Sequence, residues 1–515
     1  MRVHLMSPDS DFEVPGLDRR ALPDPLAWHV ADMMQDLQVD VVLDAMAAGD
    51  DTIRSVCRTA LLEPPARPED IAYRSAVLAD FQARPQLLAQ LYRIATGALQ
   101  RPRSLWLISN GRPESLLRKS QTLLTHMAEG LDQLRPLVDA ELADVSSPGL
   151  KGFAATIRDN LPDDYMADLH ATLEVLDRRS GVLMLAGIGP DGGVARPDPR
   201  VIGTVGRFFH RLGLEGRTGT WTLPDRDEAG AQAMQALRDR ALRTVARAAE
   251  QASIHVRSFF SCLRDETAFY LGCLNLRSRL EAAGMPVAIA QVAGAGGDVF
   301  GAESLYDPGL VLRTGGGVVG NDVDTGSRGL LVVTGANHGG KTTLLRSIGL
   351  AQLLADAGAY VPAARMSVSQ ARGVYTHWQR EEDQAMKHGK LDEELSRIGR
   401  LAEVMRPGSL LLSNESFAST NEAEGSQIGL EAIRGFVAAG VRVAAVTHLY
   451  DLAETICTSG EPAAVFLRAE RGENGERSYR IPAGPPLPTA YARDFYRREF
   501  GAELPGAEPS YARTE

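Results

Sequence analysis

Gly335-Ala336-Asn337-His338-Gly339-Gly340-Lys341-Thr342 is the stretch that decides the fold, because it fills the G-x-x-x-x-G-K-[ST] pattern of a phosphate-binding loop. The apolar run 329–334 before it predicts a short buried strand, and the run 343–350 after it predicts a helix. In such a strand, loop and helix, backbone N–H groups and the positive helix end face phosphate oxygens, and glycines allow close approach. The stretch therefore predicts a nucleoside triphosphate as ligand.

Within this loop, Lys341 is expected to reach the β- and γ-phosphates, and Thr342 to ligate Mg²⁺. The alternative is an ordinary glycine-rich turn before a helix, but the Lys-Thr pair at the required offset favours the phosphate loop. The predicted nucleotide-binding residues of the loop are Gly335, Asn337, His338, Gly339, Gly340, Lys341, Thr342 and Thr343.

Two further predicted strands end in polar residues. The apolar run 409–413 ends in Asn414-Glu415, as a Walker B segment requires. Glu415 is the predicted general base, because a carboxylate there can orient and deprotonate the water that attacks the γ-phosphate. The run 441–447 ends in His448, which we predict to sense the γ-phosphate, a surface or capping histidine being the alternative. Glu415 and His448 are thus the predicted catalytic residues.

Together these residues resemble the MutS-type ATPases, which are the mismatch-repair proteins and their relatives. Segment 334–343 resembles the family's phosphate loop, 359–363 its aromatic-Val-Pro-Ala segment, and Thr447-His448 its Thr-His pair. Gly320-Asn321-Asp322 resembles its Pro-Asn-Asp stretch, and the specific match covers residues 305–455. The resemblance implies an ABC-like P-loop NTPase domain, ATP and Mg²⁺ as cofactors, Asn321 as a further nucleotide-binding residue, and a homodimer with composite ATP sites.

Two positions depart from the family's pattern. Its Walker B aspartate, which usually holds the Mg²⁺ shell through water, is Asn414 here. An amide still accepts a hydrogen bond from a metal-bound water, so we predict Asn414 and Thr342 as metal-site residues and a slow ATPase. In the segment that reaches across the family's dimer, Gly389 replaces a serine, leaving the N–H groups of Gly389 and Lys390 to contact the partner's nucleotide. The alternative is that 383–394 is a charged, solvated loop.

Composition narrows the class of protein. The net charge of −11, from 55 basic and 66 acidic residues, produces no global basic field, so any DNA contact must come from local arginine clusters. The four cysteines show neither a Cys-x-x-Cys pair nor zinc-ligand spacing, which favours reduced cysteines in a cytosolic protein. The sequence has neither a leader-like apolar segment nor a run of about eighteen apolar residues. We therefore expect a cytoplasmic protein without membrane insertion.

The first three hundred residues are predicted to be mostly helical. Leucines within 116–134 and 169–176 recur at three-, four- and seven-residue steps, and 228–283 predicts one long helix that is almost free of Gly and Pro. In the family that this chain resembles, such helices form a core and lever, and 181–224 corresponds to a DNA-gripping clamp; a plain helical bundle is the alternative. We predict an N-terminal helical segment (1–60), a helical core and lever with a clamp-like insertion near 180–225 (61–300), an α/β P-loop ATPase domain (301–500) and a flexible tail (501–515).

Mismatch readers of this family insert a phenylalanine from a Phe-x-Glu motif, which this chain does not contain. Segment 73–81 already resembles the start of the family's core domain, so we expect neither a mismatch-reading nor a connector domain before it. Backbone contacts with mismatched, branched or duplex DNA are predicted for local basic residues. They are Arg101, Arg103, Arg112, Arg118, Lys119, Arg196, Arg200, Arg207 and Arg211.

The sequence thus predicts a MutS-like ATPase that couples ATP binding and hydrolysis to DNA binding in repair or recombination. One alternative is a nucleotide-gated DNA- or protein-binding dimer with negligible hydrolysis, caused by Asn414 and Gly389. Another is a small-molecule P-loop kinase, which would need an acceptor pocket and a monomeric site that the sequence does not suggest.

Overall fold

The computed structural model of this chain describes residues 2–10, 12, 27–100, 112–177, 185–188, 194–198, 228–294, 297, 299–336, 338–379, 389–470 and 477–487. It divides into two compact units. Unit 1 comprises Met1–Glu13 and Ala79–Ala268, and unit 2 comprises Val14–Leu78 and Phe269–Glu515. Each unit therefore combines two separate parts of the chain, and the division into domains near residues 60 and 300 stays a prediction.

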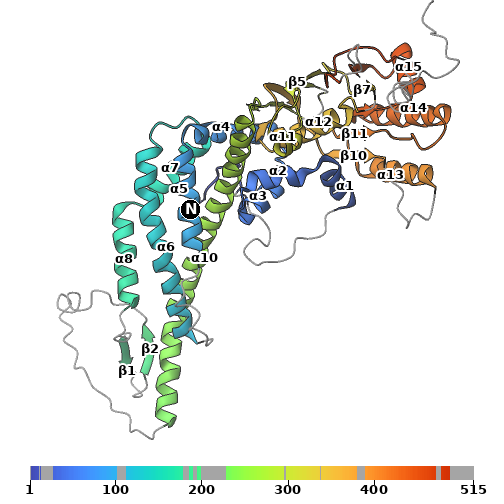
Figure 1. Cartoon of the computed structure of the whole chain (residues 1–515). Coiled ribbons are helices and arrows are strands. Elements are labelled where there is room, and N and C mark those ends of the chain that lie inside the picture. Colours follow the sequence, from blue (N-terminus) through green and yellow to red (C-terminus); the bar gives the residue numbers. More distant parts are fainter. Residues whose placement is uncertain are drawn as a thin grey trace, which may run out of the picture. The chain divides into compact units, whose positions relative to one another are not determined.

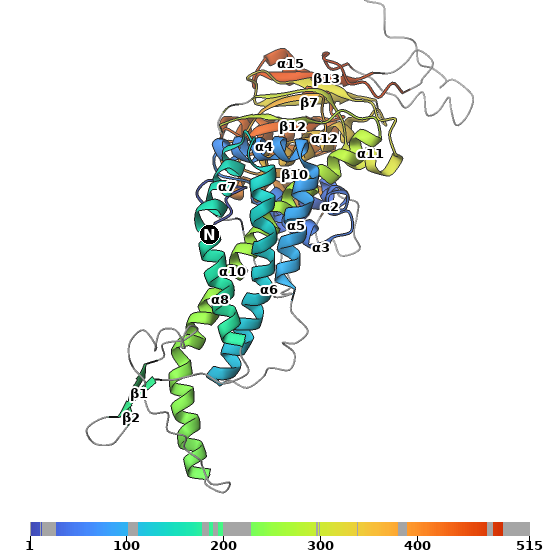
Figure 2. The ribbon, with the colours of Figure 1, turned by 90° about the vertical axis from the view of Figure 1, so that its left-hand side faces the viewer.

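Unit 1 is built from long helices. Its elements are α5 (Pro85–Leu99), α6 (Pro113–Glu141), α7 (Pro148–Asn160), α8 (Asp163–Asp177), the antiparallel pair β1 (Leu185–Ile188) and β2 (Val194–Asp198), and most of α10 (Glu228–Ala282). α4 (Pro68–Ala83) ends in this unit. α5, α6 and α8 lie side by side (Figures 1 and 2). α10 confirms the predicted long helix to within one residue.

The core of unit 1 explains the leucine spacing. α6 buries Leu124, Met127, Leu131 and Leu134 along one face, as expected for an amphipathic helix packed on its neighbours. A Cβ on Gly130 of the same helix would lie only 2.9 Å from the ring of Phe260 in α10. The glycine therefore lets the two helices approach closely, which compensates for its low helix propensity.

Unit 2 contains a five-stranded parallel sheet in the order β10-β11-β12-β7-β13. Most residues of its strands are buried, because both faces of such a sheet are covered. The predicted strands at 329–334, 409–413 and 441–447 are all present, as β7, β11 and β12. The bounds are β7 (Leu330–Gly335), β10 (Val374–Trp378), β11 (Leu410–Asn414), β12 (Arg442–Val446) and β13 (Ala464–Ala469).

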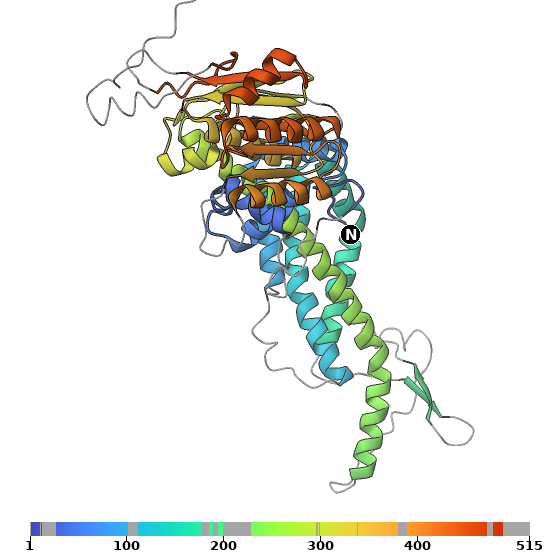
Figure 3. The ribbon, with the colours of Figure 1, turned by 90° about the vertical axis from the view of Figure 1, so that its right-hand side faces the viewer.

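Helices cover both faces of this sheet. On one face, α13 (Lys390–Val404), α14 (Glu422–Ala438) and α15 (Tyr450–Ser459) enclose a core around Leu330, Leu411 and Phe436. Figure 3 shows α13 and α14 in orange in front of the strands. On the other face lies α12 (Lys341–Asp356), where a Cβ on Gly349 would come within 2.6 Å of Leu412 Cδ1. Close packing on both sides fixes the strand ends that carry the predicted site.

Three helices from the early part of the chain belong to this same unit: α1 (Trp28–Leu37), α2 (Val39–Ala47) and α3 (Asp51–Leu62). α1 packs against β10, where the hydroxyl of Thr376 donates to the buried carboxylate of Asp36 at 2.7 Å. The guanidinium of Arg400 in α13 lies 4.3 Å from the ring centroid of Trp28 in α1. Segment 28–62 is thus integrated with the parallel sheet.

A second, four-stranded sheet in the order β4-β9-β5-β6 stands beside the first. Its strands are β4 (Gln291–Ala293), β5 (Phe300–Leu305), β6 (Asn321–Asp324) and β9 (Arg365–Ser369); β3 (Ala288–Ile289) pairs with β8 (Tyr360–Val361), and α11 (Pro308–Thr314) follows β5. The outer edge of β13 is covered by segment 480–484, through bonds such as Arg468 N to Pro482 O at 2.9 Å. The predicted fold class, a mostly helical region and an α/β region with a parallel sheet, is confirmed at this level.

Several predictions lie outside the described residues. Of the predicted clamp-like insertion near 180–225, only β1 and β2 are described, and the tail 501–515 is not described at all. Within the described ranges, none of the helices combines the length and the apolar character needed to cross a membrane.

Candidate functional site: a phosphate-binding loop beside a catalytic turn

The predicted strand, loop and helix are present, since β7 ends at Gly335 and α12 begins at Lys341. Gly335 has φ +113° and Gly340 has φ +92°, conformations that favour glycine. A Cβ on Gly335 would lie 2.8 Å from the backbone N of Ala469, and one on Gly339 would lie 2.8 Å from Ala469 Cβ. The end of β13 therefore packs so tightly against the loop that glycine is required there. His338 adopts φ 60° in the loop, whereas Asn337 lies outside the described residues.

Lys341 is held inside the loop that precedes it. Its Nζ donates to the carbonyl oxygens of Gly335 at 3.0 Å and Ala336 at 2.9 Å, and the residue is only 4% exposed. Burial lowers the pKa of Lys341 to about 8; the negative charge of Glu415 opposes this change and the positive charge of Arg477 adds to it. The ammonium group is thus a desolvated cation that an anionic ligand would stabilise.

The two predicted metal-site residues contact one another. Thr342, in the first turn of α12, donates its hydroxyl to Asn414 Oδ1 at 3.1 Å, at the carboxyl end of β11. Thr343 lies in the same turn. In the described part of the chain, no group of three or more His, Cys, Asp and Glu side chains is arranged to hold a metal ion. A cation at this site would be bound by neutral oxygens of the protein together with other oxygen ligands.

The two predicted catalytic residues also meet. His448 Nε2 donates to Glu415 Oε1 at 2.9 Å, and each side chain is about one-third exposed. The backbone N–H of Glu415 donates to Val446 O at 2.9 Å, which ties the turn after β11 to the end of β12. The hydrogen bond from His448 lowers the pKa of Glu415 despite partial burial, and the charge of Lys341 contributes. Glu415 is therefore an ionised carboxylate within the electrostatic reach of Lys341.

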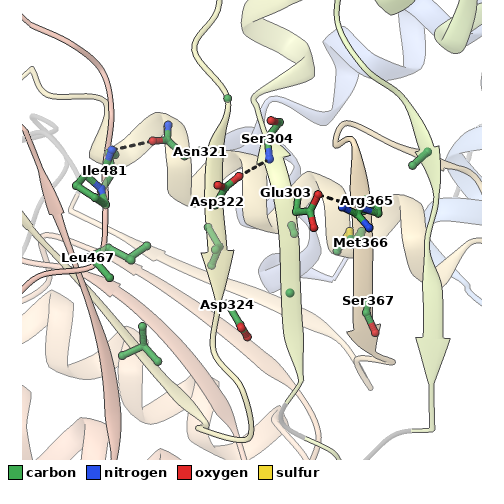
Figure 4. Close-up of a pocket in the computed structure, with 18 of the residues that line it drawn as sticks. Glu303, Ser304, Asn321, Asp322, Asp324, Arg365, Met366, Ser367, Leu467 and Ile481 are labelled. Atoms are coloured by element: carbon green, nitrogen blue, oxygen red, sulfur yellow. Dashed lines mark hydrogen bonds and ion pairs between the residues drawn. The ribbon is translucent and has the colours of Figure 1, made fainter.

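Asn321 has a role that the sequence did not indicate. Its Nδ2 donates to Tyr479 O at 3.1 Å, and its Oδ1 accepts from Ile481 N at 2.7 Å (Figure 4). A Cβ built on Gly340 would lie 3.7 Å from Tyr479 Cδ1, so this late segment passes directly beside the phosphate loop. Asn321 thus fastens the segment to β6, and its nucleotide contact stays a prediction.

Beside Asn321 lies a hollow of about 1420 Å³ between the second sheet and β13, which Figure 4 shows. Its polar side chains include the ion pair of Arg365 with Glu303 at 2.9 Å and the Asp322 carboxylate, which accepts from Ser304 N at 2.8 Å. The sequence did not indicate this hollow, because its walls come from strands that are distant in sequence.

Arg477 was also missed. Its Nη1 is buried and has no hydrogen-bond partner among the described residues, and its charge lowers the pKa of Lys341. A buried N–H group without a partner is costly, so a nearby anionic oxygen would be a favourable addition. The only sequence signal was its positive charge, in a segment without a recognisable motif.

The remaining predicted contact residues are exposed or not described. Gly389 is the exposed N-cap of α13, and a Cβ there would meet nothing within 4 Å. At the start of α6, Arg112, Arg118 and Lys119 are exposed, and Arg118 pairs with Glu114 at 3.8 Å. The side chains of the other predicted DNA-contacting residues lie outside the described part: Arg101, Arg103, Arg196, Arg200, Arg207 and Arg211.

Comparison with known proteins extends this picture. The MutS2 N-terminal domain family model matches residues 66–283, and the MutS domain V model matches residues 331–476. The chain is 30% identical over 186 residues to the DNA mismatch repair protein MutS of Symbiobacterium thermophilum, covering 33% of this chain and 21% of the relative. It is 29% identical over 165 residues to the endonuclease MutS2 of Clostridium botulinum, covering 32% and 19%.

A third relative, the endonuclease MutS2 of Exiguobacterium sibiricum, is 33% identical over 123 residues, which is 24% of this chain and 16% of the relative. The chain thus spans about a fifth of the length of these curated relatives. The two matching domain models lie in the order helical region, then α/β region, and the second contains the phosphate loop, Glu415 and His448. On these matches, the chain belongs to the MutS-type family.

Proposed function

We propose that this protein is an ATPase that couples ATP binding and hydrolysis to DNA binding in DNA repair or recombination. The observation that carries the proposal is the 2.9 Å pairing of Glu415 with His448 at the carboxyl edge of the parallel sheet, beside the loop that holds Lys341. A base, a cation and a glycine-lined loop are the parts that phosphoryl transfer to water requires.

The residues present fit a nucleoside triphosphate. The glycines of the loop leave no room for a Cβ against Ala469, and the loop leads into the N-terminus of the 16-residue helix α12, where backbone N–H groups favour an anion. Lys341 is a desolvated cation, and Arg477 supplies a second positive charge with a buried N–H group. Both features are costly without an anion and favourable with one. The parallel sheet with its loop and helix supports an ABC-like P-loop fold.

Thr342 and Asn414 would hold Mg²⁺, which when bound neutralises charge on the phosphates. Asn414 accepts a hydrogen bond from Thr342 but carries no negative charge, so it holds a cation less strongly than a carboxylate. Glu415, ionised and oriented by His448, is left to accept the proton of the attacking water. These differences support slow rather than absent hydrolysis.

The coupling to DNA is supported by the names of the relatives, one of which is a DNA mismatch repair protein. In this chain, the exposed Arg112 and Lys119 at the start of α6 are the described candidates for backbone contacts. We further propose a homodimer with composite ATP sites, in which the exposed N-terminus of α13 at Gly389 approaches the partner's nucleotide.

The test is steady-state ATP hydrolysis by the purified protein at fixed salt, alone and with duplex, mismatched or branched DNA. Stimulation or inhibition by one DNA form supports the coupling and identifies its class. Lys341→Ala should abolish ATP binding, whereas Glu415→Gln should retain binding and slow turnover at least about 100-fold. Unchanged turnover in Glu415→Gln would remove this residue from the mechanism.

The second candidate function is a nucleotide-gated DNA- or protein-binding dimer with negligible hydrolysis. The neutral pair of Thr342 and Asn414 favours it, because both partners at the predicted metal site are uncharged. Tight ATP binding without turnover would support this alternative. Asn414→Asp should then raise turnover sharply, and no gain in that variant would count against Asn414 as the cause.

A further inference from the structure

The turn that carries Glu415 adopts an unusual conformation. Glu415 has φ 56° and Phe417 has φ 64°, so two non-glycine residues separated by a single residue lie in the left-handed region. Side chains with a Cβ rarely adopt this conformation, and it persists only where the surrounding structure enforces it. Something outside the turn must therefore hold its backbone, and with it the direction of the Glu415 side chain.

One restraint comes from β10. Ser416 lies between the two left-handed residues, and its hydroxyl is 2.6 Å from Nδ1 of the buried His377 and 2.7 Å from the hydroxyl of Ser413. The ring of Phe417 is buried and stacked on the His377 imidazole, with centroids 6.0 Å apart. These contacts fix the middle of the turn against the sheet.

The other restraint is Glu394, on the buried face of α13. Its Oε2 accepts a hydrogen bond from the backbone N of Phe417 at 3.0 Å and another from the hydroxyl of Ser419 at 3.1 Å. Glu394 is only 6% exposed. Burial raises the pKa of this carboxyl, while the bonds from Ser419 and Phe417 and the charge of Arg397 lower it. The hydrogen bonds from Phe417 and Ser419 therefore offset part of the cost of burying this carboxyl.

α13 is itself anchored to the sheet. Arg397, one turn after Glu394, donates to Trp378 O at the end of β10 at 2.9 Å and pairs with Asp32 of α1 at 3.2 Å. Arg397 is 5% exposed, so this anchor is buried as well. Glu394 therefore reaches the turn from a helix whose position relative to the strand ends is fixed.

We infer that Glu394 is a positioning residue: it holds the left-handed turn 415–417 and thereby keeps the Glu415 carboxylate in its pairing with His448. This inference rests on the proposed function of Glu415 as the base for ATP hydrolysis. Glu394 acts through the backbone of Phe417 and does not touch the reacting atoms. Loss of the Glu394 carboxyl should therefore lower the rate of ATP hydrolysis while leaving nucleotide binding at the loop 335–343 intact.

The experiment compares Glu394→Ala and Glu394→Gln with Glu403→Ala and Glu403→Gln, since Glu403 is an exposed glutamate on the same helix. Equilibrium ATP binding and single-turnover hydrolysis are measured separately in the full chain. We expect Glu394→Ala to slow single-turnover hydrolysis at least tenfold with a Kd for ATP within twofold of the unmodified protein. Glu394→Gln should stay within about threefold, because an amide oxygen can accept both hydrogen bonds. The Glu403 variants should match the unmodified protein.

Two results would overturn the inference. One is hydrolysis by Glu394→Ala at the unmodified rate. The other is a Glu394→Gln variant as slow as Glu394→Ala, because that would mean that the negative charge, as in a second base, matters rather than the hydrogen bonds. A general loss of stability would lower ATP binding and hydrolysis together in Glu394→Ala, which also contradicts a positioning role.

A readout without nucleotide separates this inference from the proposed function. The imidazole NMR signals of His448, assigned by their absence in His448→Asn, report its pairing with Glu415. They should shift in Glu394→Ala and remain in place in Glu394→Gln and in both Glu403 variants. If the unmodified protein hydrolyses no ATP but these shifts occur, the proposed function fails while the positioning role stands. If hydrolysis depends on Glu415 but His448 does not respond to Glu394→Ala, the positioning role fails alone.

Discussion

Raising the pH should weaken ATP binding through a single group, Lys341. Burial lowers its pKa from the ordinary lysine value of 10.5 to about 8, so the ammonium loses its proton over the pH range in which the protein is easily studied. Phosphate oxygens favour the charged form. Above pH 8, the unliganded protein must therefore take up a proton to bind ATP, and binding weakens accordingly.

The size of the effect follows from this pKa. About nine-tenths of the unliganded protein carries the charge at pH 7 and about one-tenth at pH 9, so the apparent Kd for ATP should rise about tenfold between them. The free energy of unfolding should depend on pH in the opposite direction and rise as the pH is raised. Because the folded pKa of Lys341 is lowered, the unfolded chain binds more protons between pH 8 and 10.5, and stability rises with pH in that window by about 3 kcal/mol.

The assay is isothermal titration of ATP at fixed ionic strength from pH 7 to 9.5, repeated near pH 8 in two buffers of different ionisation enthalpy. About half a proton should be taken up per site at pH 8. Lys341→Arg is the matched control, since a guanidinium stays charged and any binding it retains should not depend on pH. The free energy of unfolding in urea should rise with pH between pH 8 and 10.5 in the unmodified protein, and this rise should be absent in Lys341→Met. Tight ATP binding with a constant Kd from pH 7 to 9 would refute the reasoning.

Three further predictions concern neighbouring residues. His448→Asn should raise the pKa of Glu415 towards its ordinary value, because the hydrogen bond that chiefly lowers it is lost; the acid limb of the kcat–pH profile should move to higher pH. Arg477→Gln should raise the Kd for ATP about tenfold, as loss of a charge-assisted hydrogen bond does, and isothermal titration would detect this. Gly425→Ala should destabilise the protein by about 1–3 kcal/mol and slow hydrolysis, because the new Cβ would lie 2.5 Å from Phe417 O. Gly435 is exposed on the same helix, and a Cβ there would meet nothing within 4 Å, so Gly435→Ala should stabilise the protein by about 0.5–1 kcal/mol. Urea denaturation measures both changes in the free energy of unfolding.

Short sequence patterns predicted a strand or helix correctly where the residues of that stretch alone determined its structure. The apolar run 329–334 predicted β7, because a buried parallel strand needs apolar residues on both faces. The near absence of Gly and Pro in 228–283 predicted α10. Asn414, Glu415 and His448 were predicted at strand ends, and parallel strands bring their carboxyl ends to one edge, which is why Asn414 meets Thr342 and Glu415 meets His448.

The remaining features depend on contacts between distant residues, for which one sequence carries little signal. Glu394 was expected within a segment facing a partner, whereas its carboxylate is turned inward onto Phe417 and Ser419. Asn321 holds Tyr479 and Ile481, which the sequence did not indicate, and its expected nucleotide contact stays a prediction. Asp36 showed no motif, because its contact with Thr376 joins residues that are hundreds of positions apart. The burial of charged side chains is decided by tertiary packing rather than by local periodicity.

The division of unit 2 between two parts of the chain has a consequence for synthesis. α1 to α3 leave the ribosome well before β10 and α12, against which α1 packs and which follow only after all of Ala79–Ala268 has been made. At about 5–20 residues per second, synthesis of Ala79–Ala268 alone takes on the order of 10–40 s. Until then, Leu37 of α1 cannot pack against Gly349 of α12, and Asp36 has yet to meet Thr376. Completion of this side of the parallel sheet therefore comes late in synthesis, and until then the apolar face of α1 is open to chaperones.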